Sequence, residues 1–292
     1  MNKGKLLTVA VISGVLMAGS ALQALAGTSG YETYKSALKN TKAAQSLTSQ
    51  VKVTLQDNGN TILSADSVTK KDLAKDAASN TVSINSDGKS ATFEMFQQDD
   101  QMVMKRSGED VYYQVEKGGH KQRKAKAHDE ELHKDMENVI DALTQNLQNQ
   151  ITIQEGEKGT KKIDLQLTGT EIPLAVNAVG SMLVKHVPQA HEKAQDMPKP
   201  FAGIKPELPR LKDAIQVKEI RLSAEVSADN YIEEHTATIV VSGKDAQGNA
   251  HDLTFNLEAD LSDFNQTTVT PVDIAGKKVE TISMKHGKLK KH

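Results

Sequence analysis

Two histidine pairs are the first residues whose type and spacing suggest metal chemistry. His128 and His133 enclose three acids in HDEELH, and His186 and His191 are also five residues apart. A zinc-protease helix needs its two histidines four residues apart on one face. Side chains five residues apart do not share a helix face. We therefore predict solvated helix surfaces at both places, with no metal site and no cofactor.

A nucleophile motif is the second chemical candidate. Ser36 and Lys39 match S-x-x-K, but the S-D-N and K-T-G elements that accompany it in penicillin-binding enzymes are absent. No G-x-S-x-G, phosphate-binding or dinucleotide-binding pattern occurs. We predict that the protein is not an enzyme, with a hydrolase on an unrecognised site as the weakest alternative.

Basic clusters are candidates for contact with anionic surfaces. One lies in residues 117–126 and the other in the tail KHGKLKKH. Such clusters are either solvated charge or contacts for anionic wall polymers and phospholipid head groups. With 36 basic and 38 acidic residues, the chain has no excess of positive charge for nucleic acid. The candidate contact residues are Lys121, Arg123, Lys124, Lys126, Lys288, Lys290 and Lys291.

Alternation of apolar and polar residues dominates the chain. In HDLTFNLEADL, residues 251–261, every second residue is apolar. This period of two predicts strands with one buried face. The predicted strands, separated by turn residues, are Gln50–Gln56, Thr61–Lys70, Thr81–Asn85, Ala91–Phe96, Met102–Lys105, Val111–Glu116, Ile151–Gln154, Lys162–Thr168, Val217–Ser227, Ile232–Ser242 and His251–Leu261.

Three segments have helical periodicity instead. They are Tyr31–Leu47, Asp129–Gln148 with an apolar stripe that includes Met136 and Leu143, and a segment that begins at Pro173. The stretch 197–209 holds four prolines and is predicted to be a long loop. Strands and helices in this order predict an α+β fold, a strongly curved antiparallel sheet (an incomplete barrel) that wraps amphipathic helices.

The ends of the chain are predicted to lie outside this domain. Residues 1–26 have the basic start, apolar run and Ala24-Leu25-Ala26 cleavage site of a secretory signal peptide, cleaved near Ala26-Gly27. We expect one domain over 27–276 and a basic tail over 277–292. Because there is no cysteine, neither a lipid anchor nor a disulfide is expected, and the protein is predicted to be secreted, free or associated with the cell wall.

The order of these elements resembles a known superfamily. YETYKSALKNTKAAQSL is followed by SQVKVTLQDNG, EDVYYQVEKGG and, near the end, DLSDFNQTTVTPVD. This resembles the LolA-like and LppX/LprG-like secreted carriers, and especially exported relatives from Bacillus-like bacteria. The resemblance implies a half-barrel with an apolar cavity between sheet and helices that holds the acyl chains of lipids or lipoproteins.

Two readings of the apolar strand face remain open. It is either ordinary core or the wall of a cavity for a lipid or other amphiphile. The candidate cavity residues are Leu253, Phe255, Leu257, Ile220, Leu222, Met136 and Leu143. We expect a non-enzymatic secreted carrier, and the alternative is a structural or interaction protein of the cell envelope or spore surface with the same fold and no ligand.

Overall fold

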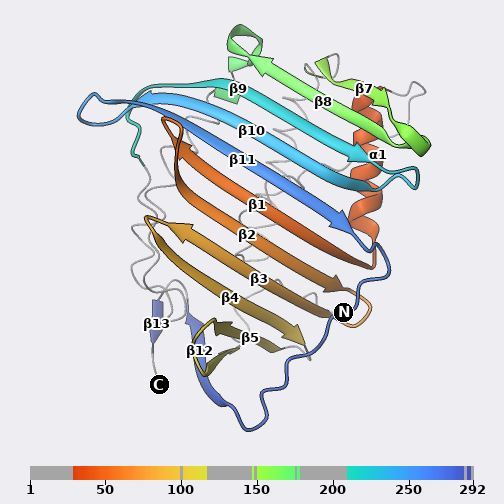
Figure 1. Cartoon of the computed structure of the whole chain (residues 1–292), viewed down its shortest axis with the longest axis vertical. Coiled ribbons are helices and arrows are strands. Elements are labelled where there is room, and N and C mark those ends of the chain that lie inside the picture. The colour runs from red at the N-terminus through yellow and green to blue at the C-terminus, as the bar shows by residue number, and fades with distance from the viewer. Residues whose placement is uncertain are drawn as a thin grey trace.

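One large sheet dominates the molecule (Figure 1). The computed structural model describes residues 29–98, 101–116, 147, 150–174, 176–177, 209–285 and 288–290, and every structural statement below concerns these. The strand order is β13-β12-β6-β5-β4-β3-β2-β1-β11-β10-β9-β8-β7. The bounds are β1 Ser46–Asp57, β2 Asn60–Asp72, β3 Ala77–Ser86, β4 Lys89–Gln98, β5 Gln101–Arg106, β6 Val111–Glu116, β7 Thr152–Glu155, β8 Lys161–Thr168, β9 Asp213–Val226, β10 Ile232–Lys244, β11 Ala250–Ser262, β12 Lys278–Lys285 and β13 Lys288–Lys290.

The sheet consists of two meanders joined at its centre. Strands β1 to β6 pair in chain order, as do β7 to β11, and all of these pairs are antiparallel. The two meanders meet where β1 pairs with β11, from Thr48 opposite Ser262 to Asp57 opposite Leu253. The predicted antiparallel sheet is confirmed, and each predicted strand corresponds to one of β1 to β11.

The β1–β2 hairpin shows how local sequence sets this pairing. Asn58 and Gly59 both have positive φ, 49° and 81°. A two-residue turn with two positive φ values matches the right-handed twist of the flanking strands, and Asn-Gly is its preferred sequence. The Asn58 side chain also accepts a hydrogen bond from the Asp252 backbone N–H at 2.9 Å, which ties the turn to β11.

Helix α1 is shorter than the sequence analysis predicts. It spans Gly30–Ala43, with the Ser29 hydroxyl accepting a hydrogen bond from the Glu32 backbone N–H at its start. The prediction of helix up to Leu47 is wrong, because Ser46 and Leu47 already belong to β1, where they pair with Asp72 and Lys71 of β2. Pairing with β2 therefore takes precedence over local periodicity at this boundary.

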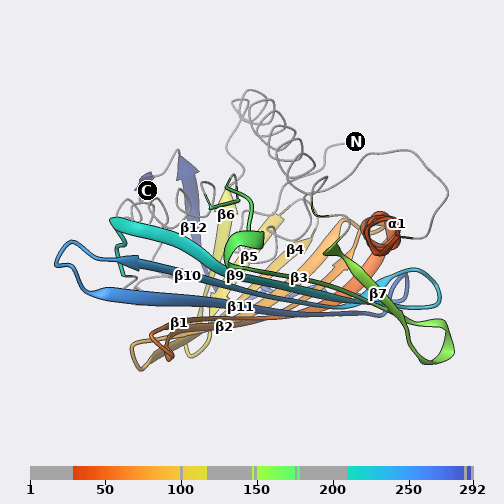
Figure 2. The same cartoon turned by 90° about the horizontal axis from the view of Figure 1, so that it is seen from above.

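The helix lies on one side of the sheet and crosses the ends of several strands (Figures 1 and 2). We call this side the α1 face. Ala37 and Leu38 of α1 pack there in a core cluster with Val51, Ile163, Ala224, Val226, Ile232, Ala259 and Leu261. The helix starts close to the chain before β7, since a Cβ added at Gly30 would lie 2.9 Å from Ile151 Cγ2.

Two further core clusters lie beyond the reach of α1. The first joins strands β1 and β8 to β11 to flanking segments through Leu55, Leu147, Leu165, Leu167, Ile172, Leu211, Val217, Val241 and Leu253. The second holds the outer strands together through Val82, Met95, Met104 and Tyr113. Apolar burial is thus spread along the whole sheet rather than gathered at one centre.

The end of the chain adds strands that the sequence analysis does not predict. Residues 278–285, assigned there to a basic tail, form β12, which pairs with β6 in parallel. The preceding linker is held by Gln98 at the end of β4. Its side-chain amide donates to the Val272 carbonyl at 2.9 Å and accepts from the Val272 N–H at 2.7 Å, as a neighbouring strand would.

Several sequence predictions concern residues outside the described ranges. These are the signal peptide, the helix Asp129–Gln148 with Met136 and Leu143, most of the helix that begins at Pro173, and most of the proline-rich loop. The described part is one open sheet with a single α-helix, so the sheet that wraps several helices stays a prediction. Over the same residues, no helix has the length and apolar character needed to cross a bilayer.

Candidate functional site

The five sheet residues predicted to line a cavity lie on one face. Phe255 of β11 stands opposite Ile239 of β10, which stands opposite Ile220 of β9. Leu257 stands opposite Ala237, which in turn faces Leu222. Directly opposed residues of antiparallel strands project to the same side, so these side chains share one surface.

The same register continues across β1 and β2. Phe255 faces Leu55, which faces Leu63, and Leu257 faces Val53, which faces Ala65. Two lines of apolar side chains therefore cross five neighbouring strands. We call them row one, Ile220, Ile239, Phe255, Leu55 and Leu63, and row two, Leu222, Ala237, Leu257, Val53 and Ala65.

Burial along β11 shows where this surface is covered. Leu253 near one end is 3% exposed, and Ala259 and Leu261 near the other end are 8% and 7% exposed. Between them, Phe255 and Leu257 are only half-buried. Ile220, Leu222, Ala237 and Ile239 on the adjacent strands are half-buried as well. The apolar surface is closed at both ends and incompletely covered in its middle.

The covering elements explain this pattern. At one end α1 packs on Ala259 and Leu261. At the other end Leu211, Ile172 and Leu147 pack around Leu253. A sheet face that carries branched aliphatic and aromatic side chains normally packs against another layer. On β9, β10 and β11 the middle of rows one and two is thus only partly covered, whereas Leu55 and Ala65 at the other side of the rows are buried.

The opposite face of the same strands is polar. Thr238 donates a hydrogen bond to the Asn256 side-chain oxygen at 2.9 Å, and the Asn256 amide donates to the Thr54 hydroxyl at 3.4 Å. Lys52 and Glu258 lie beside them, both more than half exposed. This face suits water, so an apolar ligand would find its complement only on the α1 face.

A histidine lies within the α1 face, under the helix. His235 of β10 stands opposite Ala224 and Ala259, and it is 6% exposed. The Tyr34 hydroxyl of α1 lies 3.1 Å from His235 Nε2, while Nδ1 is buried without a hydrogen-bond partner. Burial lowers the pKa of His235 to about 4 and raises the pKa of Tyr34 to about 12, so both are neutral at pH 7.

A second buried polar atom belongs to the residue next to Tyr34. Lys35 Nζ is buried and has no hydrogen-bond partner, and it lies 5.7 Å from the centre of the Tyr31 ring. An ammonium group above an aromatic ring is weakly stabilised. That interaction replaces only part of the hydration that burial removes.

A third polar cluster lies at the far end of β11. His251 is held between two carboxylates, with Nδ1 2.9 Å from Asp57 and Nε2 3.4 Å from Asp245. Burial lowers the pKa of His251, but the hydrogen bonds to Asp57 and Asp245 raise it by a larger amount, so the pKa is above its usual value. Hydrogen bonds, first from the Asn249 side chain, lower the pKa of Asp245 to about 2.

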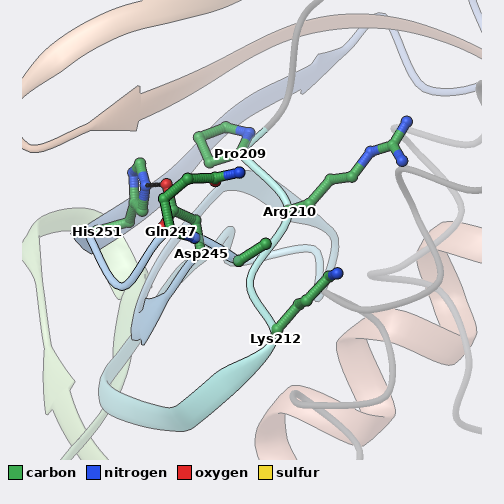
Figure 3. A pocket seen from close by; sticks show the side chains of 7 residues that line it. Pro209, Arg210, Lys212, Asp245, Gln247 and His251 are labelled. Atoms are coloured by element: carbon green, nitrogen blue, oxygen red, sulfur yellow. Dashed lines mark hydrogen bonds and ion pairs between the residues drawn. The ribbon is translucent and has the colours of Figure 1, made fainter.

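This cluster borders a pocket of about 490 Å³ (Figure 3). Arg210 and Lys212 point away from His251 and Asp245, so the charged groups do not converge on one point. Both ring nitrogens of His251 face carboxylates, which leaves neither to act as a base on a substrate. The lining residues are Pro209, Arg210, Lys212, Asp245, Ala246, Gln247 and His251.

The structure adds little about the remaining residues that the sequence analysis considered, which are the S-x-x-K serine, the basic clusters and the histidine pairs. Ser36 lies on α1, and its hydroxyl accepts a hydrogen bond from the Asn230 side chain at 3.0 Å, as on an ordinary helix surface. Lys288 and Lys290 belong to β13. The histidine pairs and the cations Lys121, Arg123, Lys124, Lys126 and Lys291 are outside the described residues. Within those residues no group of three or more His, Asp or Glu side chains is arranged so that it could hold a metal ion.

Comparisons with known proteins add little to this description. No family model matches the sequence, and no curated protein matches it significantly. A LolA superfamily protein from Nitrosomonas europaea covers 85% of this chain and 97% of its own at 6% identity and a TM-score of 0.23. An S-type phycobiliprotein lyase from Guillardia theta covers 81% and 98% at 7% identity and a TM-score of 0.20. Scores this low support no argument about function.

Proposed function

We propose that the protein is a non-enzymatic carrier that binds a lipid or other amphiphile along rows one and two of the α1 face. The observation that supports this is the half-buried middle of an apolar face that is closed at both ends. Exposing such side chains to water is unfavourable by roughly 25 cal/mol per Å² of apolar surface. An acyl chain laid along the rows would remove that surface from water.

The wider biological setting belongs to the same proposal. The resemblance to LolA-like carriers implies a half-barrel that covers helices and holds the bound chain in an apolar cavity between sheet and helices. The signal-peptide pattern implies that the carrier works outside the cytoplasm. The basic clusters around Lys121 and Lys290 would then contact anionic wall polymers or membrane head groups.

A binding titration with a matched pair of variants tests the proposal. Phe255→Ala removes the aromatic ring from the centre of row one, whereas Thr254→Ala changes the adjacent residue on the opposite face. Titration with a fluorescent fatty acid should show affinity about tenfold weaker for Phe255→Ala, which corresponds to about 1.4 kcal/mol. Thr254→Ala should bind like the wild type.

Purification from the native host provides an independent test. Native mass spectrometry of the purified protein should show a co-purifying amphiphile that solvent extraction removes. If no amphiphile is found and the fluorescent fatty acid does not bind, the carrier proposal is wrong. The structural or interaction role in the cell envelope would then be the better explanation of the fold.

A further inference from the structure

The orientation of α1 on the sheet determines which of its residues face the rows. Asn40 donates hydrogen bonds to the Asp229 and Asn230 carbonyls, and Asn230 donates to the Ser36 hydroxyl. Asp229 and Asn230 form the turn between β9 and β10, where these strands end. The flank of α1 with Ser36 and Asn40 is therefore turned toward the strand ends.

Lys35 lies on the other flank. At 3.6 residues per turn, its side chain is about 140° around the helix from that of Asn40. Ala37, Leu38 and Thr41, which are buried against the sheet, lie on the wider arc between these two directions, so Lys35 and Asn40 flank the buried side of the helix. Lys35 is therefore directed from α1 along the α1 face, toward the middle of the sheet and row two.

The Nζ atom of Lys35 is shielded from water, although the residue as a whole is half-buried. Among the described residues this Nζ has no hydrogen-bond partner, although three N–H groups are available for donation. Buried charges in proteins are normally paired, because an unpaired buried charge is strongly unfavourable. The partner that this site lacks is negatively charged and accepts hydrogen bonds.

A second unpartnered atom lies on the same side of the sheet. His235 Nδ1 is buried without a partner. Ala237 follows His235 by two residues on β10 and belongs to row two, so the histidine adjoins the row at its α1 end. Two polar atoms without hydrogen-bond partners among the described residues, Lys35 Nζ and His235 Nδ1, thus lie on the same side of the sheet as the half-buried apolar side chains of row two.

We propose that the amphiphile bound on the rows carries a carboxylate headgroup, as a fatty acid does, and that Lys35 binds it beside His235 at the α1 end. This inference rests on the proposed function and specifies the ligand class for the same face. The apolar chain lies along rows one and two, and the headgroup supplies the anion that the ammonium lacks.

Two probes with the same apolar chain, one with a charged and one with an uncharged headgroup, test the inference on the full chain. The probes are 11-(dansylamino)undecanoic acid and its methyl ester, titrated by fluorescence. Lys35→Gln should weaken binding of the acid about tenfold, the usual scale for a lost charge-assisted hydrogen bond. Binding of the ester should change less than about twofold. Lys39→Gln, which alters an exposed lysine of the same helix, should leave both affinities unchanged.

Each result separates the two proposals. If the wild type binds neither probe, the carrier function itself fails. If Lys35→Gln weakens neither probe, or both equally, the rows bind an amphiphile without a headgroup contact at Lys35. A lysophosphatidylglycerol that competes more strongly than oleate would overturn the choice of a carboxylate. Thermal melting of Lys35→Gln should occur at or above the wild-type temperature, since the variant removes an unpaired buried charge.

Discussion

The hydroxyl of Tyr34 lies 3.1 Å from Nε2 of His235, although the two residues are 201 positions apart in the chain. Their rings meet edge to face, with centres 5.7 Å apart and planes at 61°. The contact joins α1 to β10, the strand between β9 and β11, and keeps a neutral imidazole inside the protein. It therefore makes the attachment of the helix sensitive to protonation.

Acid should weaken the fold through His235. Its folded pKa of about 4 is below the unfolded value of 6.5, so its contribution to stability is complete above pH 6.5 and lost as the pH falls toward 4. The loss is about 3 kcal/mol over that window. Urea melts at pH 7 and pH 4 should show His235→Leu losing about 3 kcal/mol less than the wild type does. Equal losses in the two proteins would contradict the buried neutral state.

His251 should act in the opposite direction. Its pKa is raised by Asp57 and Asp245, so its stabilisation is complete below the unfolded pKa and disappears as the pH rises through the higher folded value. His251→Gln should therefore be more destabilising at pH 5.5 than at pH 8.5 in urea melts. Asp57→Asn should show the same trend. A penalty that is independent of pH would mean that the ion pairs do not form in solution.

Adjacent residues of β11 should respond very differently to substitution. Leu257→Asp places a carboxylate in row two between Val53 and Ala237, and should destabilise the fold by at least about 2 kcal/mol. Glu258→Ala removes only a 4.0 Å ion pair with Lys52 between exposed side chains, and should change stability by less than about 0.5 kcal/mol. Chemical denaturation measures both, and equally mild effects would refute the assignment of faces.

A buried hydroxyl fastens the end of α1 to β10. Thr41, 1% exposed, accepts a hydrogen bond from the Ile232 backbone N–H at 2.9 Å. Thr41→Val keeps the shape but leaves that N–H buried and unpaired, which should cost about 1–3 kcal/mol in thermal or urea unfolding. Thr61→Val, at an exposed strand position, is the control and should be nearly neutral. A neutral Thr41→Val would show that water reaches Ile232.

The sequence predicts the strands well because their alternation is strong. Each predicted strand is found, and the residues of HDLTFNLEADL project as alternation requires. The helix end and β12 are missed for a common reason. Ser46 pairs with Asp72 of β2, and Val279 of β12 pairs with Tyr112 of β6. The end of the helix and the presence of β12 therefore depend on strand partners that are distant in the chain. Local periodicity contains no information about such pairing.

The candidate site is predictable only in part. Alternation shows that Phe255 and Leu257 share a face. Their half-burial depends on where α1 and Leu211 pack on that face, which the alternation does not contain. His235 occupies an apolar position in the alternation of β10, and this was a signal that the sequence analysis did not use. The isolation of Lys35 Nζ depends on three-dimensional packing, which no pattern in the sequence records.

The pairing of β1 with β11 places a constraint on the order in which the protein can be assembled. Synthesis of β1 is complete at Asp57, but its central partner ends only at Ser262. Until then β1 remains an unpaired edge strand of the first meander, and contacts so distant in the chain form slowly. The pairing at the centre of the sheet therefore cannot form until nearly all of the chain has been made, so the two halves of the sheet join late.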